Sequence, residues 1–160
     1  MIVRVATVGD RDAIWSILEP LIRAGEVFTL DRGMGRDAAL SYWFSEGHEV
    51  FVAEDDCVVV GSYYLRANQR GGGSHVANCG YMTASAATGT GVARAMCEHS
   101  LERARNRGFK AMQFNFVIES NERAVRLWQS CGFTILCRLP KAFLHPQLDY
   151  VDAFVMFREL

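Results

Sequence analysis

The hydrophobic residues of this chain follow two periods, one typical of helices and one typical of strands. Ile14, Ile17, Leu18 and Leu21 recur at helical spacing, and the polar residues at 7–10 offer N-cap groups before them, so a helix is expected to end near residue 23. Three further helices are expected at about 36–44, 89–107 and 120–131. Apolar runs rich in β-branched and aromatic residues predict strands at about 2–5, 49–54, 57–66, 75–83, 111–118, 133–139 and 151–158.

The order of these elements mixes helices with strands and indicates an α/β (α+β) fold. Asp55 and Asp56 are expected to form a tight turn between consecutive strands, and the three glycines at 71–73 a loop. The glycines and charges at 24–35 predict a further loop, which we expect to close over a substrate. No linker, repeat or low-complexity tract divides the 160 residues, so we expect one domain spanning 1–160.

Composition narrows the functional classes. The 17 basic and 18 acidic side chains leave a net charge of −1, without the basic excess typical of a nucleic-acid-binding protein. No stretch approaches the roughly 20 apolar residues of a membrane span, and the N-terminus lacks the apolar segment of a signal peptide. The five cysteines are widely spaced and contain no Cys-x-x-Cys pair, which argues against a zinc site and a disulfide framework. We therefore expect a cytoplasmic protein with no metal, nucleic acid or membrane partner.

The segment from Tyr81 to Ala93 carries the clearest binding signal in the chain. It leads from a strand, through small residues, into a helix whose first turn is expected to contain Gly91, Val92 and Ala93. A helix N-terminus offers unpaired N–H groups and the positive end of the helix dipole, which bind phosphate oxygens, and small side chains leave those groups accessible. A P-loop would need a Lys-Ser or Lys-Thr pair, and a dinucleotide fingerprint a third glycine. These residues alone leave open a strand-to-helix turn that binds nothing.

A second motif follows at 121–133. Its apolar residues share one helix face at i, i+3, i+4 and i+7: Ala124, Leu127, Trp128 and Cys131. Gly132 can then form a left-handed C-cap. With the loop around Gly91 upstream, the order Asn-x-x-Ala-x-x-Leu-aromatic and Gly132-Phe133 resembles the GNAT acetyltransferases over essentially the whole chain. The resemblance implies the GNAT fold: a central mixed, mostly antiparallel sheet of about seven strands with about four helices, splayed between the fourth and fifth strands.

The resemblance also implies acetyl-CoA as co-substrate. In that family the loop amides bind the pyrophosphate, and the preceding strand pairs with pantetheine. The cofactor-binding residues implied here are Tyr81, Met82, Thr83, Thr88, Gly89, Thr90, Gly91, Val92, Ala93, Asn121 and Trp128. Thr88 replaces the usual Gln or Arg of the loop. Trp128 replaces a tyrosine that often protonates the departing thiolate, and an indole N–H is too weak an acid for that role.

Two strand asparagines, Asn78 and Asn115, are the expected catalytic residues, since an amide N–H between the splayed strands can hold a carboxylate or a developing oxyanion. The alternative is that they satisfy backbone groups where the sheet opens. The chain also resembles the branch that acetylates proline analogues such as azetidine-2-carboxylate, on Asn78–Tyr81, Phe114-Asn115, Ser120-Asn121, Leu127-Trp128, Pro140 and 151–153. That likeness implies that Asn78 holds the substrate carboxylate and that Asn115 acts at the acetyl carbonyl.

The function expected is transfer of an acetyl group to a small amine, an amino or imino acid, by direct attack in a ternary complex. The substrate-binding residues expected are Asn78, Phe28 and Tyr64. The sequence offers six candidate general bases: Glu26, Tyr63, Tyr64, His75, Tyr81 and Glu119. A protein N-terminus or a lysine is the alternative acceptor. A non-catalytic acyl-CoA-binding module and a nucleotide-binding protein are the alternatives outside this class, and a homodimer is left open.

Overall fold

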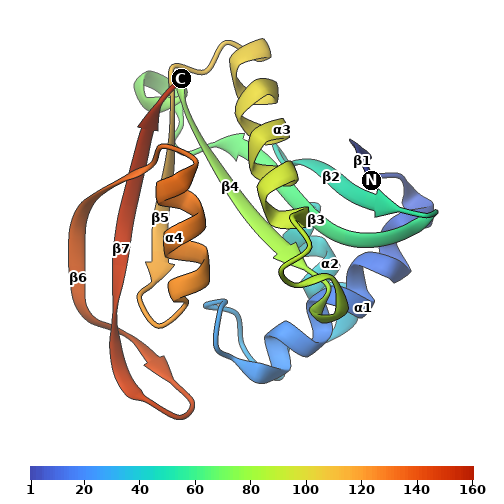
Figure 1. Ribbon diagram of the computed structural model, residues 1–160, viewed down its shortest axis with the longest axis horizontal. Coiled ribbons are helices and arrows are strands. Elements are labelled where there is room, and N and C mark those ends of the chain that lie inside the picture. The colour runs from blue at the N-terminus through green and yellow to red at the C-terminus, as the bar shows by residue number, and fades with distance from the viewer.

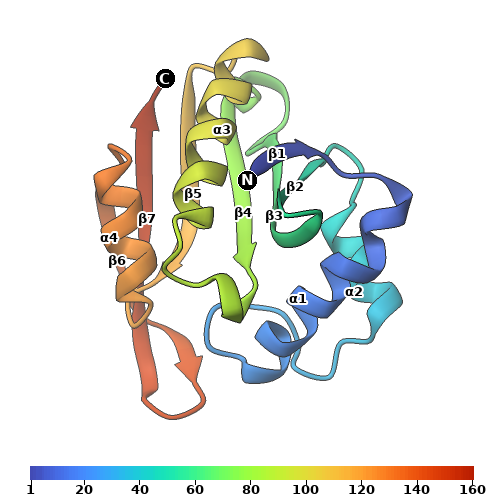
Figure 2. The same ribbon diagram turned by 45° about the vertical axis from the view of Figure 1, so that its right-hand side comes forward.

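The computed structural model describes residues 1–160 and contains one seven-stranded sheet, in the order β1-β2-β3-β4-β5-β7-β6. Helices α1 and α2 cover one face of the sheet, and α3 and α4 cover the other (Figures 1 and 2). The strands β1 to β7 span Ile2–Val5, Glu49–Asp55, Val58–Ala67, Val76–Thr83, Ala111–Ile118, Thr134–His145 and Asp149–Glu159. The helices α1 to α4 span Arg11–Ala24, Arg36–Trp43, Val92–Asn106 and Glu122–Ser130.

The contact between β4 and β5 is the one parallel pairing in the sheet, and it is very short. Val76 pairs with Ala111 and Ala77 with Met112, and no further residues pair. Beyond them the two strands diverge, as Figure 1 shows. We call the unpaired stretch, residues 78–83 of β4 facing 113–118 of β5, the β4–β5 opening. The mixed, mostly antiparallel seven-stranded sheet, splayed between the fourth and fifth strands, is therefore confirmed.

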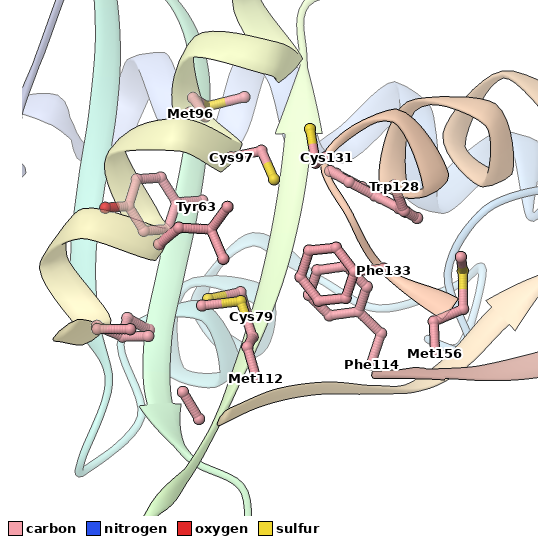
Figure 3. Close-up of a cluster of buried hydrophobic side chains, with 14 of the residues drawn as sticks. Tyr63, Cys79, Met96, Cys97, Met112, Phe114, Trp128, Cys131, Phe133 and Met156 are labelled. Carbon is pink, nitrogen blue, oxygen red and sulfur yellow. The ribbon is translucent and has the colours of Figure 1, made fainter. Parts of the chain in front are cut away.

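Two hydrophobic cores hold the layers together. The larger has 19 buried residues and joins the sheet to α3 and α4; Figure 3 shows Phe133 and Trp128 from this cluster beside Phe114 of β5. The second has 11 buried residues and joins the sheet to α1 and α2. Its fully buried Trp43 donates from Nε1 to Ser62 Oγ (3.0 Å), which donates to the carbonyl of Phe51 (2.7 Å). The polar groups of this core are thereby satisfied, so its burial carries little desolvation cost.

Several element boundaries differ from those the sequence predicts. Helix α3 begins at Val92, three residues later than expected, because Gly89 and Gly91 have φ values of 86° and 93° that a helix excludes. The turn between β2 and β3 uses Asp56 and Cys57, both at positive φ, rather than Asp55 and Asp56. The glycines at 71–73 form a short 3-10 turn.

The two closing strands are also longer than predicted. Strand β6 continues from Thr134 to His145, and β7 begins at Asp149 instead of near 151. The register shifts between Leu139 and Phe143, where Pro140 interrupts the pattern. An edge strand tolerates a proline and a bulge because one side of it needs no ladder hydrogen bonds. No helix in the chain is both long and apolar enough to span a bilayer.

Gly80 fixes how β4 packs against β3. A Cβ built on Gly80 would lie 2.5 to 2.7 Å from Cε1, Cζ and Oη of Tyr64, the residue that pairs with it on β3. The Tyr64 ring is held from its other sides by stacking on His48, with ring centroids 4.1 Å apart, and by the edge of Trp43 at 5.1 Å. The ring therefore cannot move aside without disturbing the second core.

We predict that Gly80→Ala lowers the free energy of unfolding by about 1–3 kcal/mol, the range for overpacking a well-packed site. In a Tyr64→Ala background the same change should cost less than about 0.5 kcal/mol, because the ring atoms it meets are gone. Gly72→Ala is the matched control, since nothing lies within 4 Å of its Cβ and its φ is not positive. Denaturant unfolding of the four variants checks this; an equal cost of Gly80→Ala in both backgrounds would contradict it.

Candidate active site

The N-terminus of α3 presents a group of unpaired backbone donors. The N–H groups of Gly89, Gly91, Val92, Ala93 and Arg94 have no acceptor within the protein. Gly89 and Gly91 are exposed, and a Cβ on either would meet nothing within 4 Å. Free donors at the positive end of a 15-residue helix, with open space in front of them, suit a phosphate group.

The two threonines of this loop do not obstruct those donors. The Thr90 hydroxyl donates to the carbonyl of Ala87 at 2.8 Å, and the Thr88 hydroxyl makes a longer contact of 3.4 Å with the carbonyl of Ala84. Both side chains thus turn back onto the loop itself. Thr88 stands where the family usually has Gln or Arg, and it adds no charge. The groups available to bind an anion here are therefore the backbone N–H groups.

A row of amide side chains crosses the β4–β5 opening. Asn78 on β4 is buried and donates from Nδ2 to the carbonyl of Gln113 on β5 at 2.9 Å. The Gln113 amide donates to Asn115 Oδ1 at 2.9 Å, and the Asn115 amide donates to Asn68 Oδ1 at 2.7 Å. We call these four residues the amide row. The two predicted catalytic residues, Asn78 and Asn115, therefore belong to one network, and each keeps one amide hydrogen unused.

Aromatic rings close the α3–α4 side of the same opening. Trp128 is 8 % exposed, and its ring centroid lies 4.8 Å from that of Tyr81 on β4 and 5.1 Å from that of Phe114 on β5. The Trp128 indole N–H makes no hydrogen bond within the protein, whereas the Tyr81 hydroxyl pairs with Ser100 Oγ at 2.7 Å. Tyr81 thus offers backbone, not side chain, to a ligand in the opening.

The connection between β5 and α4 holds two more unpaired polar groups. Asn121 caps α4, its Oδ1 accepting from the N–H of Ala124 at 3.3 Å, and its amide nitrogen remains free. Ser120 Oγ is buried without a hydrogen-bond partner. Ser120 also lines a cavity of about 420 Å³ with Val125 and Phe154, on the side of α4 that faces β7. That cavity is distinct from the β4–β5 opening.

The α1–α2 side of the sheet contributes aromatic side chains near the amide row. Tyr64 lies over Gly80, two residues along β4 from Asn78, and Phe28 meets Trp43 edge-on with ring centroids 6.2 Å apart. Phe28 lies in the α1–α2 connection. Arg23 on α1 donates from Nη1 to the carbonyl of Arg32 at 2.6 Å, which holds this connection against α1. Figure 2 shows this connection at the C-terminal end of β4. The predicted residues Phe28 and Tyr64 thus share one aromatic group with Trp43.

The structure narrows the candidate general bases. Burial raises the pKa of the Tyr63, Tyr64 and Tyr81 phenols, so all three stay protonated at neutral pH. Glu119 is engaged in an ion pair with Arg138 at 2.9 Å. His75 is exposed at the start of β4, before the opening begins. Glu26 therefore remains as a candidate general base. It lies in the α1–α2 connection and forms no ion pair.

Sequence reasoning did not single out three residues of this region: Arg66, Asn68 and Gln113. Arg66 donates from Nε to Asn78 Oδ1 at 3.2 Å. Because side chains alternate along a strand, Arg66 lies on the same face of β3 as Tyr64. This alternation is the sequence signal that could have identified Arg66 as a site residue. No group of three or more His, Cys, Asp or Glu side chains in the chain could hold a metal ion.

Comparisons with known proteins identify the family and the fold. The model of the acetyltransferase (GNAT) family matches residues 15–133. A GCN5-related N-acetyltransferase from Kribbella flavida is 40 % identical, with 99 % of this chain and 97 % of that chain covered and a TM-score of 0.95. The N-acetyltransferase aca1 of Schizosaccharomyces pombe is 26 % identical over an alignment of 151 positions, with 84 % of this chain and 72 % of that protein covered.

A more distant structure was solved with the cofactor in place. The putative acetyltransferase yncA from Salmonella typhimurium, solved with acetyl-CoA, is 23 % identical, with 100 % of this chain and 94 % of that chain covered and a TM-score of 0.88. It shares the fold, and the free donors at the start of α3 fit the same cofactor. The chain belongs to the GNAT acetyltransferase family and is an acetyl-CoA-dependent N-acetyltransferase.

Proposed function

We propose that the enzyme acetylates the amine of a small acceptor, an amino or imino acid, by direct attack within a ternary complex. The observation that carries this proposal is the amide row, which brings Asn78 and Asn115 together across the β4–β5 opening. Free amide donors there are suited to a carbonyl or carboxylate oxygen. The aromatic group of Phe28, Trp43 and Tyr64 stands on the same face of the sheet and would bound a small pocket for the acceptor.

The cofactor would lie from the α3 N-terminus into the opening. The N–H groups of Gly89 and 91–94 would bind its diphosphate, and the unpaired edge of β4 at Tyr81–Thr83 would pair with the pantetheine arm. The free amide of Asn121 and the ring of Trp128 would flank that arm. Acetyl-CoA supplies an activated acyl group with a thiolate leaving group, whose ordinary pKa near 8.5 makes a strong proton donor unnecessary. Trp128 can therefore hydrogen-bond to the sulfur without protonating it.

Asn115 would stabilise the acetyl carbonyl as negative charge develops on its oxygen. Its Oδ1 accepts from Gln113 and one amide hydrogen is fixed by Asn68, so the second hydrogen is held in a defined direction. A preorganised donor of this kind costs no reorganisation when the charge appears. Glu26, directly or through water, would accept the proton of the acceptor ammonium before attack.

The fold alone does not choose between acceptors. Structures that share it include a phosphinothricin acetyltransferase from Sinorhizobium meliloti (20 % identical, TM-score 0.87) and a ribosomal-protein-alanine N-acetyltransferase from Brucella melitensis (22 % identical, TM-score 0.87). The preference for a small acceptor rests on the residues of this chain, namely the aromatic group and the polar amide row beside it. A thiol-release screen of amino and imino acids against peptide N-termini tests that preference.

We predict that Gly91→Glu weakens acetyl-CoA binding at least about 100-fold, because a carboxylate would face the diphosphate. The substitution also strains the backbone, since Gly91 has a φ of 93°. Gly108→Glu is the matched control: it lies beyond the other end of α3, has a φ of 83° and likewise meets no neighbour within 4 Å. Calorimetric titration checks this, and a similar loss of affinity in both variants would argue against a diphosphate site.

We predict that Asn115→Ala lowers kcat by about 10²–10³-fold, the cost of losing one oxyanion donor, and changes the acetyl-CoA Kd less than about threefold. Steady-state kinetics and titration of the same preparation separate the two effects. Asn106→Ala, an exposed asparagine at the end of α3, should leave both values unchanged. If kcat and cofactor affinity fell together, Asn115 would be a structural residue.

A further inference from the structure

Arg66 differs from the other half-buried arginines of this protein in having no partner for its terminal nitrogens. Arg4 directs them to Asp10 and Glu54, and Arg103 directs one to Glu49. Arg158 donates from Nη1 to the carbonyl of Cys131. Arg66 makes one hydrogen bond, through Nε, and no salt bridge, so both of its terminal NH₂ groups lack a partner in the protein and remain open to solvent. A guanidinium whose two terminal nitrogens have no protein partner is free to bind an anionic ligand.

The position of Arg66 connects the two halves of the proposed acceptor site. Arg66 pairs with Asn78 across β3 and β4, and it follows Tyr64 on the same face of β3. The aromatic group therefore lies on one side of it and the amide row on the other. Its Nε is fixed by Asn78 Oδ1, which sets the plane of the guanidinium.

The surroundings of Arg66 contain no compensating negative charge. The His48 ring stacks on Tyr64 with ring centroids 4.1 Å apart, and burial lowers the pKa of its imidazole despite the hydrogen bond with the carbonyl of Trp43. The Tyr64 phenol is protonated for the reason given above. Arg66 thus has no carboxylate partner in the protein, and its two adjacent NH₂ groups have the planar geometry that binds a carboxylate.

We propose that Arg66 binds the carboxylate of the acceptor and selects amines that carry one. This inference rests on the proposed function and gives it a specificity determinant. Asn78, whose Oδ1 and one amide hydrogen are already engaged, becomes the positioning residue for Arg66, and its remaining hydrogen can join the same carboxylate. The carboxylate end of the acceptor would sit at Arg66, while its amine would extend along the amide row toward Asn115.

The test uses matched acceptors with saturating acetyl-CoA: proline and prolinamide, azetidine-2-carboxylate and its carboxamide, and alanine and alaninamide, followed by thiol release. Each carboxamide has the less basic amine, so a preference for the carboxylate cannot arise from amine protonation. The wild-type enzyme should favour carboxylates by about 10²-fold or more in kcat/KM, the effect of one desolvated charge pair. Arg66→Gln should lower kcat/KM for carboxylates by about 10²-fold, mainly through KM, and leave carboxamides within about threefold.

Two further variants keep the test decisive. Arg66→Lys retains the positive charge but lacks the two coplanar NH₂ groups of the guanidinium, so it should keep part of the preference for carboxylates. This variant also tests the proposal if Arg66→Gln folds poorly. Arg70→Gln removes an exposed arginine four residues away and should change nothing. An unchanged acetyl-CoA Kd shows that the site is intact.

The outcomes separate the two proposals. A wild-type enzyme that uses both members of each pair equally, or an Arg66→Gln variant that loses both equally, overturns the role of Arg66 and leaves the proposed function standing. Absence of turnover with every acceptor overturns the proposed function, and the role of Arg66 with it. A carboxylate preference that disappears in Arg66→Gln supports both.

Discussion

The early end of pairing between β4 and β5 is the constraint on which the rest of this structure depends. Only two residue pairs join these central strands, so residues 78–83 of β4 and 113–118 of β5 have no strand partner on the side of the opening. Unpaired backbone groups in the interior are costly unless something else satisfies them. The protein satisfies one of them itself, through the Asn78 amide on the carbonyl of Gln113. The remaining edge is available to a ligand that carries its own amides, as pantetheine does.

The two faces of the opening are built for different tasks. The α3–α4 face is apolar, with Trp128 packed on Tyr81 and Phe114, and it leads to the unpaired donors at the start of α3. The α1–α2 face carries the amide row and Arg66. Under the proposed function, cofactor binding and acceptor recognition would use opposite faces, so variation on the second face would change the acceptor without loss of cofactor binding.

The fold could be predicted from the sequence because its signals are local. Gly132 marks the end of a helix by capping chemistry, and the hydrophobic periods locate the core faces. The extent of β6 could not be predicted, since Pro140 is tolerated there only because the strand lies at the edge of the sheet. The candidate site was predicted in part: Asn78 and Asn115 were singled out from their place in the strands. Their connection through Gln113, and the unpaired state of Arg66, depend on the register between strands distant in sequence.

The central claim is that backbone N–H groups left unpaired by the protein bind the cofactor, and amide hydrogen exchange with and without CoA tests it most directly. Binding should slow exchange at 89–94, at the start of α3, and at 78–83, along the open edge of β4, by about tenfold or more at a CoA concentration well above Kd. Helix α2 at Arg36–Trp43, on the acceptor side, should be unaffected. Bound CoA that left both segments exchanging at their free rates, or that protected α2 instead, would contradict the account.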